Sequence, residues 1–378
     1  MSALVVGVPT ETKPDERRVA VTPDGVTELR SHGVDVLVQS GAGDGVGMAD
    51  DSYAAAGARI VADADEVWTA SGLVCKVKEP QRDELRHLRS DLTLFTYLHL
   101  AAYPEVARAL CEAGTTGIAY ETVMRADGSL PLLAPMSEIA GRMATQAGAR
   151  FLEAPQGGSG VLLSGAPGVA PAQVAVIGAG NVGWNAAIIA AGMGAQVTLL
   201  DRNIERLRAL EVSLPGRITT LASNTGSVAR AVADSDLVVG AVLVAGGRAP
   251  TVVDESMIAA MRPGSVLADV AIDQGGCFAT SRETSHRDPV YEVHGVLHYC
   301  VGNIPGAVPR TSTSALTNAT LPYLVAIARF GPDEACARDE SLAHGLNTRL
   351  GTVVNPVVAG ALAELDGTAA HHDTAVPA

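Results

Sequence analysis

The sequence predicts an α/β fold with two mostly parallel sheets. Two observations lead to this fold class. Short apolar runs alternate with polar helical stretches through the first third of the chain, and a second alternating series begins near residue 173. A βαβα order of this kind places the strands in parallel and covers the sheet with helices. The length of 378 residues allows two domains, each large enough for its own core.

The first series contains five expected strands and four expected helices. We expect the strands at residues 4–8, 35–39, 73–77, 93–98 and 116–120. We expect the helices at residues 23–31, 53–56, 84–89 and 104–113. The first helix has a clear start, because Thr22 can cap its free amide groups and Pro23 suits its first turn.

A long helix follows the first series. Residues 137–152 give the longest uninterrupted helical pattern, with Ser137 as the expected cap and apolar residues at every fourth position from Ile139 to Phe151. A stretch rich in glycine and proline, residues 156–171, comes next. We interpret the helix and this stretch as the connector between two domains.

The second series predicts another set of strands and helices. The strands are expected at residues 173–177, 196–200, 217–221, 237–242, 265–270 and 296–299. The helices are expected at residues 184–193, 315–328 and 356–365. The tail from residue 367 is small and polar, which favours a frayed end.

Composition limits the partners and the compartment. The net charge of −14 argues against nucleic acid or an anionic membrane as the main partner, because both need a basic face. The most apolar stretch, residues 174–200, contains five glycines and reads as strand, helix and strand instead of a membrane span. The N-terminus lacks a signal-peptide pattern, and the five cysteines have no disulfide or zinc spacing, which favours the cytoplasm.

A GxGxxG turn predicts a dinucleotide site, since it follows an apolar strand and opens an apolar helix. Gly178 permits the tight turn, Gly180 lets the backbone approach a pyrophosphate, and Gly183 lets helix and strand pack closely. Asp201 can accept hydrogen bonds from ribose hydroxyls, which favours NAD over NADP, and the neighbouring Arg202 weakens that preference. The alternative is a glycine-rich turn that binds no nucleotide.

Four further residues lie at expected strand ends and could carry chemistry. Arg18 can clamp a carboxylate with two parallel hydrogen bonds. Lys78 and His99 end two other strands, and an imidazole near a second basic group suits proton transfer. Asp273 follows the strand at 265–270, and ligands of open α/β sheets bind at the carboxyl ends of strands. The alternatives are a buried core histidine and a turn aspartate.

Longer stretches carry a resemblance to a known family. They are residues 7–12, 18–20, 76–80, 98–101, 120–122, 131–138, 178–183, 271–276, 303–306 and 308–313. On these stretches the sequence closely resembles the L-alanine dehydrogenases, over nearly all of residues 3–365. The related α subunit of the proton-translocating transhydrogenase shares several of them.

The resemblance implies a role for each candidate residue. Arg18 and Lys78 hold the carboxylate and carbonyl oxygen of pyruvate, or the carboxylate of alanine. His99 is the acid/base, Asp273 assists water attack and proton transfer, and Met136 lies near the substrate. The residues implied to contact NAD are Ser137, Gly178, Gly180, Asn181, Val182, Gly183, Asp201, Ile272, Asp273 and Asn303.

The resemblance also implies the organisation and the reaction. It implies two Rossmann-like, doubly wound domains, the first completed by the C-terminal segment. Residues 1–130 with 306–378 would form the substrate domain, and residues 131–305 the NAD-binding domain. The implied reaction is reversible, NAD-dependent oxidative deamination of L-alanine to pyruvate and ammonium by a cytoplasmic homohexamer. No metal-ligand spacing is recognisable in the sequence.

Three other function classes are alternatives to this one. Another NAD enzyme, such as a 2-hydroxy-acid dehydrogenase, would share the GxGxxG turn but leave the stretches at 76–80 and 272–276 unexplained. A transhydrogenase component would need a membrane partner and no arginine, lysine and histidine converging on a small carboxylate. A non-catalytic redox sensor would tolerate loss of His99 and Asp273. We therefore expect an alanine dehydrogenase.

Overall fold

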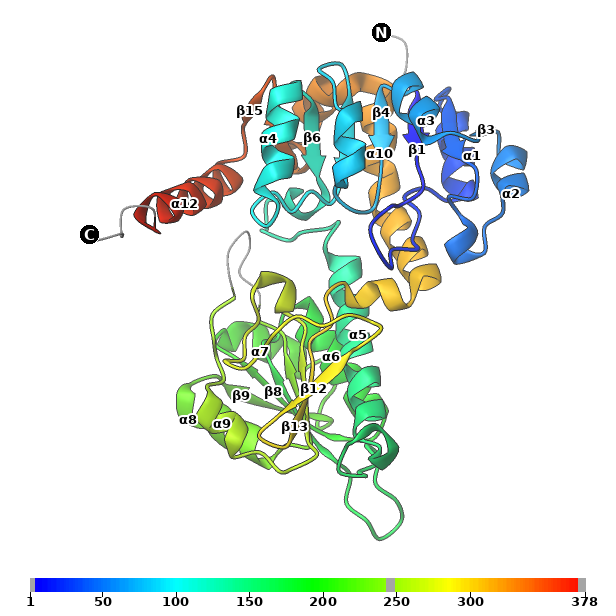
Figure 1. Cartoon of the computed structure of the whole chain (residues 1–378). Helices are drawn as coiled ribbons and strands as arrows, with labels where there is room; N and C mark the ends of the chain where they lie inside the picture. The colour runs from blue at the N-terminus through cyan, green and yellow to red at the C-terminus, as the bar shows by residue number, and fades with distance from the viewer. Residues whose placement is uncertain (1–3, 243–248, 373–378) are drawn as a thin grey trace. The chain divides into compact units, whose positions relative to one another are not determined.

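The chain divides into two compact units. The computed structural model describes residues 4–242 and 249–372. Unit 1 spans residues 1–136 and 308–378, and unit 2 spans residues 137–307. The junctions thus lie six and two residues beyond the expected ones. Figure 1 shows a sheet with helices packed beside it in each unit.

Unit 1 is built on eight strands in the order β15-β14-β6-β5-β4-β1-β2-β3. These are β1 (Val6–Val8), β2 (Val36–Gln39), β3 (Arg59–Val61), β4 (Leu73–Cys75), β5 (Thr93–Thr96), β6 (Thr116–Ala119), β14 (Leu346–Arg349) and β15 (Thr352–Val353). Strands β1 to β6 pair in parallel, whereas β14 and β15 add antiparallel pairs at one edge. The C-terminal segment therefore completes the first sheet, as predicted.

The helices of unit 1 flank this sheet. They are α1 (Pro23–Ser31), α2 (Asp50–Ala55), α3 (Ala64–Ala70), α4 (Pro104–Ala113), α10 (Pro309–Arg338), α11 (Glu340–His344) and α12 (Pro356–His372), with 3-10 helices η1 (Asp44–Val46), η2 (Arg82–His87) and η3 (Tyr120–Thr122). Thr22 caps α1 as predicted, by accepting a hydrogen bond from the Gly25 amide.

Three expectations for unit 1 were wrong. The helix expected at 84–89 is the 3-10 helix η2. Helix α10 extends well beyond 315–328 and breaks at Gly331, whose φ of +75° suits glycine. The tail expected to fray from residue 367 is helical to His372, and residues 373–378 lie outside the described part.

Unit 2 is built on seven strands in the order β12-β13-β11-β10-β7-β8-β9. These are β7 (Gln173–Ile177), β8 (Gln196–Asp201), β9 (Ile218–Ala222), β10 (Leu237–Gly240), β11 (Val266–Asp269), β12 (Val290–Val293) and β13 (Val296–Tyr299). Its helices are α5 (Ala134–Phe151), α6 (Asn181–Gly192), α7 (Ile204–Glu211), α8 (Thr225–Asp234) and α9 (Glu255–Ala259), with η4 (Ala154–Gln156), η5 (Ile272–Gln274) and η6 (Ile304–Ala307). The pairing is parallel except in the β12–β13 hairpin.

Helix α5 corrects two sequence expectations. It begins at Ala134, with Pro135 in its first turn, so Ser137 lies inside the helix and does not cap it. The glycine- and proline-rich stretch at 156–171 is not the connector, because it packs within unit 2. There the Ser159 amide donates to the carbonyl oxygen of Gly264 at 2.9 Å. The chain passes between the units at the first turn of α5 instead.

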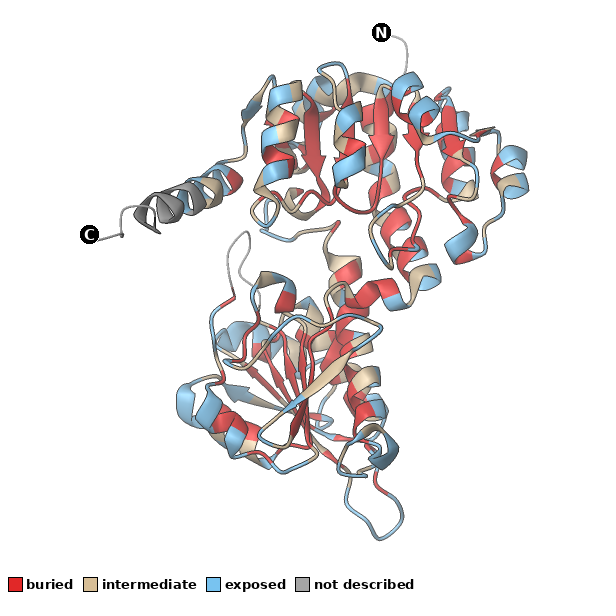
Figure 2. Ribbon diagram, in the orientation of Figure 1, coloured by how far each residue is buried: buried red, intermediate tan, exposed pale blue. Residues whose placement is uncertain are grey.

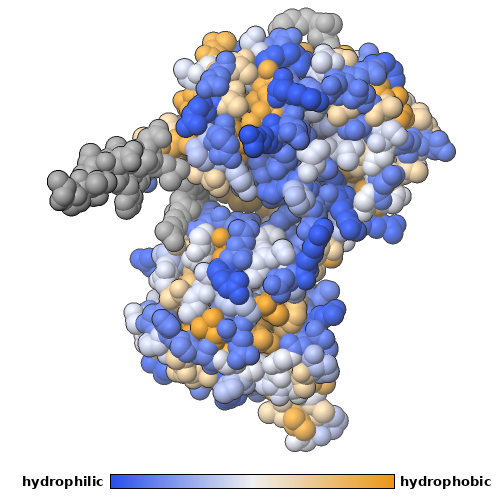
Figure 3. Space-filling model, viewed as in Figure 1, coloured by the Kyte–Doolittle hydropathy of each residue, from blue (hydrophilic) through white to orange (hydrophobic). Residues whose placement is uncertain are grey.

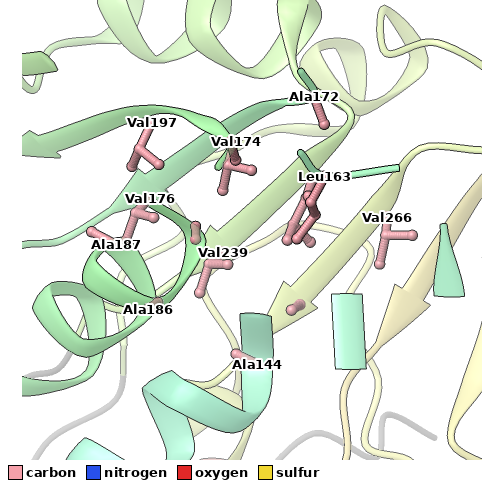
Figure 4. Packing of buried hydrophobic residues seen from close by; sticks show 14 of the residues in the cluster. Ala144, Leu163, Ala172, Val174, Val176, Ala186, Ala187, Val197, Val239 and Val266 are labelled. Atoms are coloured by element: carbon pink, nitrogen blue, oxygen red, sulfur yellow. The ribbon is translucent and has the colours of Figure 1, made fainter. Parts of the chain in front are cut away.

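The core of unit 2 depends on small side chains. The central strands of both sheets are largely buried, as Figure 2 shows. In Figure 4, Val176 and Val239 lie near Ala186 and Ala187 of α6, and all four are 0% exposed. Because alanine is small, α6 approaches the sheet closely. The most apolar stretch of the sequence is therefore a buried strand, helix and strand, as predicted.

Polar side chains cover most of the face of each unit shown in Figure 3, where hydrophobic residues form small separate patches. This surface agrees with the acidic composition of the chain. Among the helices of the described residues, none is long and apolar enough to cross a membrane.

The strand order indicates where each sheet can bind a ligand. In unit 1, β1 lies between β2 and β4, and in unit 2, β7 lies between β8 and β10. Each is a topological switch point, and ligands of doubly wound sheets bind there, outside the carboxyl ends of the strands. The fold therefore points to the loops after β1 and β4, and to those after β7 and β10.

Candidate active site

Arg18, Lys78 and His99 lie at one edge of the unit 1 sheet. They follow β1, β4 and β5, which are neighbouring parallel strands. Side-chain contacts join the three loops: the Lys13 Nζ lies 2.6 Å from Glu79 Oε1, and the His99 Nδ1 lies 3.6 Å from Glu79 Oε2. The structure therefore brings these predicted residues together at the switch point of the sheet.

The Arg18 guanidinium is buried and paired with Glu16. Its Nε donates to Glu16 Oε1 at 2.7 Å, and its Nη2 donates to Oε2 at 2.5 Å. Burial raises the pKa of Glu16, but hydrogen bonds and charge from Arg18 outweigh it and lower that pKa to about 2. The Nη1 donates to the Met136 sulfur at 3.0 Å. The two parallel bonds expected for a substrate carboxylate are thus made to Glu16.

Lys76 is a fully buried ammonium between two glutamates. Its Nζ lies 3.2 Å from Glu11 Oε2 and 2.9 Å from Glu84 Oε1. Burial lowers the pKa of Lys76, but the two carboxylates raise it by more than burial lowers it. The pKa is therefore above its usual value, and the lysine stays charged. Glu11 also accepts the Val77 amide at 2.6 Å and the Lys78 amide at 3.4 Å. The triad therefore fixes the backbone that carries Lys78.

His99 has an unusual backbone conformation. Its φ is +47°, in the left-handed region that residues other than glycine seldom adopt. The Glu121 carboxylate, which follows β6, accepts the His99 amide at 2.6 Å and the Leu98 amide at 3.2 Å. The imidazole stacks on Tyr97, with ring centroids 5.6 Å apart. The side chain is 30% exposed while Nδ1 is buried, so the open part of the ring lies away from Nδ1.

The glycine turn of unit 2 leaves open space at the start of α6. Gly178 has a φ of +101°, and a side chain on Gly183 would run into the Gly178 carbonyl. A Cβ on Gly180, by contrast, would meet no atom within 4 Å. Gly180 is the N-cap of α6 and makes no side-chain cap, so the helix start at Asn181 and Val182 has open space before it. Helix amides and dipole favour an anion in such a space.

Asp201 lies at the end of β8 beside this turn. Its Oδ2 accepts the Ala179 amide at 2.7 Å, and its Oδ1 accepts the Asn203 amide at 2.7 Å. A carboxylate oxygen has two lone pairs, so Asp201 can still accept ribose hydroxyls. The guanidinium that reaches it, at 3.4 Å, belongs to Arg206. Sequence reasoning had singled out Arg202 instead.

Asp269 and Asp273 have different surroundings. Asp269 is fully buried, and its carboxylate accepts the Ala271 and Cys277 amides at 3.0 and 2.9 Å and the Ser281 hydroxyl at 2.5 Å. It therefore shapes the turn after β11. Asp273 lies in η5 and is exposed. This is the arrangement expected if Asp273, and not Asp269, does chemistry.

The remaining residues predicted to contact NAD belong to unit 2. Ile272 is buried in η5, and Ser137 is half-buried in α5. Asn303 follows β13 with a φ of +60°, and its carbonyl oxygen accepts from His286 at 3.1 Å. Strands β8, β7, β10, β11 and β13 are neighbours, so their carboxyl ends bring the glycine turn, Asp201, η5 and Asn303 to one edge.

Sequence reasoning missed the acidic partners of the basic residues. Glu16 and Glu79 were inside matched or neighbouring stretches, two residues before Arg18 and one after Lys78. Glu121 lay inside the matched stretch 120–122 and was given no role. Among residues 4–242 and 249–372, no three His, Cys, Asp or Glu side chains gather as a possible metal site.

Family models match both halves of the chain. The model described as "Alanine dehydrogenase/PNT, N-terminal domain" matches residues 7–140, and "Alanine dehydrogenase/PNT, C-terminal domain" matches residues 144–356. The chain belongs to the alanine dehydrogenase/PNT family. The resemblance expected from the sequence is therefore confirmed.

Individual relatives indicate which branch of the alanine dehydrogenase/PNT family this chain resembles most. The alanine dehydrogenase of Mycolicibacterium smegmatis is 54% identical over 356 residues, which cover 94% of this chain and 96% of that protein. A solved "L-alanine dehydrogenase" has a TM-score of 0.91 at 50% identity and covers 95% of this chain and 99% of its own. The transhydrogenase from Sinorhizobium meliloti has a TM-score of 0.81 at 26% identity, covering 93% and 100%. The sequence thus lies nearer the alanine dehydrogenases.

Proposed function

We propose that the protein catalyses the reversible, NAD-dependent oxidative deamination of L-alanine to pyruvate and ammonium. Close homology over nearly the whole chain gives alanine dehydrogenase activity. The observation that carries the proposed chemistry is the meeting of Arg18, Lys78 and His99 at the switch point of unit 1. A small 2-oxo acid presents a carboxylate and a carbonyl oxygen, and this group offers a cation to each and an imidazole for the proton.

Unit 2 offers a place for NAD. The space before Gly180 and the start of α6 would hold the pyrophosphate, and Asp201 would hold the adenosine ribose. We expect Ser137, Ile272, Asp273 and Asn303 to complete this pocket. Bound NAD supplies the acceptor for the hydride that leaves alanine Cα, and NADH supplies the hydride in the reverse direction.

The chain's own residues bind the substrate and move its protons. In deamination, His99 takes a proton from the alanine ammonium group, because a protonated amine does not readily release a hydride from Cα. Water then adds to the imine, with His99 and Asp273 moving protons as ammonium leaves. In amination, the Lys78 ammonium stabilises negative charge on the carbonyl oxygen of pyruvate. Arg18 holds the carboxylate in both directions.

Several expectations about organisation belong to this proposal. The substrate site would belong to residues 1–130 with 306–378, and the NAD site to residues 131–305. We also propose a homohexamer and a cytoplasmic location. Sedimentation of the purified protein would test the hexamer, which a monomer or dimer at working concentration would rule out.

The reaction can be tested by following NADH absorbance with NADH, pyruvate and ammonium, each omitted in turn. We expect loss of NADH only when both pyruvate and ammonium are present. Loss with pyruvate alone would indicate a lactate-type dehydrogenase and refute the proposal. No loss of NADH despite its binding would favour a transhydrogenase component or a sensor.

The transhydrogenase relative supplies the second candidate. Its structure matches 93% of this chain, at 26% sequence identity. Hydride exchange between two nucleotides gives no role to a buried arginine, a lysine and a histidine at the switch point of unit 1. The site therefore favours the dehydrogenase, and hydride exchange from NADH to a thio-analogue of NADP without substrate would reverse that preference.

A further inference from the structure

We infer that Glu79 is a positioning residue for His99, whose carboxylate keeps the neutral imidazole protonated on Nδ1 and so presents Nε2 to the substrate. The inference rests on the proposed role of His99. Glu79 has no role among those predicted from the sequence. Three features of the unit 1 site support it: burial, the charge on Glu79, and the way the other groups around His99 are engaged.

The first feature is a matched pair of buried atoms. Glu79 is 2% exposed, and its Oε1 accepts from Lys13 Nζ at 2.6 Å and from Gln81 Nε2 at 3.1 Å. Its Oε2 faces His99 Nδ1 at 3.6 Å. Both atoms are buried without a hydrogen-bond partner among the described residues. Each is the other's natural partner, because closing the gap by a few tenths of an ångström makes a normal hydrogen bond.

The second feature is the charge on Glu79. Burial raises the pKa of this carboxyl, but the interaction with His99 and the Lys13 ammonium outweigh burial and lower the pKa to about 2. Glu79 is therefore ionised across the working pH range and can only accept hydrogen bonds. A buried acceptor of this kind requires a proton on the ring nitrogen that faces it. The hydrogen bond at one nitrogen then decides the tautomer of the whole ring.

The third feature is that the other groups around His99 are directed elsewhere. The Glu121 carboxylate binds backbone amides at 98 and 99 and not the ring. Tyr97 stacks on the ring face and donates its hydroxyl to the Leu132 carbonyl at 2.6 Å. Tyr103 donates its amide to the His99 carbonyl, and its hydroxyl accepts from Lys13. The two glutamates thus have different roles: Glu121 fixes the backbone at residue 99, and Glu79 fixes the position of the imidazole proton.

The first test replaces Glu79 by glutamine, which keeps the size and removes the charge. We expect kcat for amination to fall about 10- to 100-fold, less than the whole contribution of an acid/base. The KM for pyruvate should change little, since Arg18 and Lys78 keep their own partners. The limb of the pH–rate profile that depends on His99 should move to lower pH, because the anion that stabilises the protonated ring is gone.

Glu84→Gln is the matched control. Glu84 is also buried, follows the same strand and is paired with a lysine, Lys76, at 2.9 Å, but it does not contact His99. It tests the loss of a buried ion-paired carboxylate as such, and its pH–rate limb should stay where it is in the wild type. A Glu79→Gln enzyme with the wild-type kcat and pH–rate limb would overturn the inference. So would an equal shift in Glu84→Gln.

A second measurement uses the wild-type protein and does not depend on whether a Glu79 variant folds. Nitrogen-15 NMR of the imidazole rings distinguishes the two neutral tautomers, and the His99 signals are those absent from His99→Asn. We expect the proton of neutral His99 on Nδ1 in the wild-type protein, and a proton on Nε2 would overturn the inference. This readout is independent of turnover. If the wild-type protein fails to aminate pyruvate, the proposed function fails while the tautomer still decides the role of Glu79.

Discussion

The buried pair of Glu16 and Arg18 allows a quantitative test of the unit 1 site. The side chains of Arg18 and Glu16 are 2% and 0% exposed, so solvent screens their interaction little. The fall of the Glu16 pKa from 4.5 to about 2 corresponds to about 3 kcal/mol of folding free energy at neutral pH. Glu16→Gln, which removes the charge and leaves Arg18 buried, should cost about 3–5 kcal/mol.

The pH dependence gives this prediction its sign. The folded-state pKa of Glu16 lies below the unfolded value, so the stabilisation is present above pH 4.5 and is lost as the pH falls toward about 2. The measurement is urea unfolding of wild type and Glu16→Gln at neutral pH and at about pH 3. The difference in unfolding free energy should be about 2 kcal/mol smaller at about pH 3 than at neutral pH.

An exposed pair provides the control. Glu205 lies 2.5 Å from Arg208, the same separation as the buried pair, but its side chain is 78% exposed. Glu205→Gln should therefore change the unfolding free energy by less than about 1 kcal/mol at either pH. The reasoning fails if both variants lose similar stability, or if the Glu16→Gln difference is as large near pH 3 as at neutral pH.

Four further variants test the two candidate sites. His99→Ala should lower kcat by about 10²-fold or more while NADH affinity, measured by fluorescence titration, is unchanged; wild-type turnover would contradict its role. Arg18→Ala should mainly raise the KM for pyruvate, and an effect confined to NADH affinity would count against the assignment. Gly180→Ala should leave the Tm near wild type, because its Cβ meets no atom, yet weaken NADH binding by about 10-fold or more. Gly183→Ala, which meets the Gly178 carbonyl, should instead lower the Tm.

The sequence predicted the central strands better than the edges. Strand β7 was predicted at its observed bounds because a strand buried on both faces is an uninterrupted apolar run. Strand β3 was missed because it is a three-residue edge strand and only one of its residues is buried. Strand β14 was missed because its buried centre is Asn347 and Thr348. Their side chains form hydrogen bonds with the N-terminal segment of the same unit, at Thr122 and the Thr115 carbonyl, which are contacts between residues more than 200 positions apart.

In the site too, features that depend on the local sequence could be predicted, and features that depend on distant parts of the chain could not. Strand ends are local features, so Arg18, Lys78, His99 and Asp273 could be nominated from the sequence. Their partners could not, because partnership depends on which loops meet at the edge of the sheet. Glu79 and His99 follow different strands, and their pairing also depends on the left-handed backbone at residue 99. The sequence pattern indicates neither the pairing of these two residues nor the backbone conformation at residue 99.

The C-terminal strands have a consequence for how the chain is made. Strand β6 ends at Ala119 and its partner β14 begins at Leu346, so at 5–20 residues per second the ribosome needs roughly 10–45 s to supply the partner. Unit 2 is continuous in sequence and can fold during that interval. The growing N-terminal half meanwhile carries an unpaired edge at β6, the kind of edge that invites aggregation. Unit 1 is therefore the first to begin translation and the last to complete its sheet.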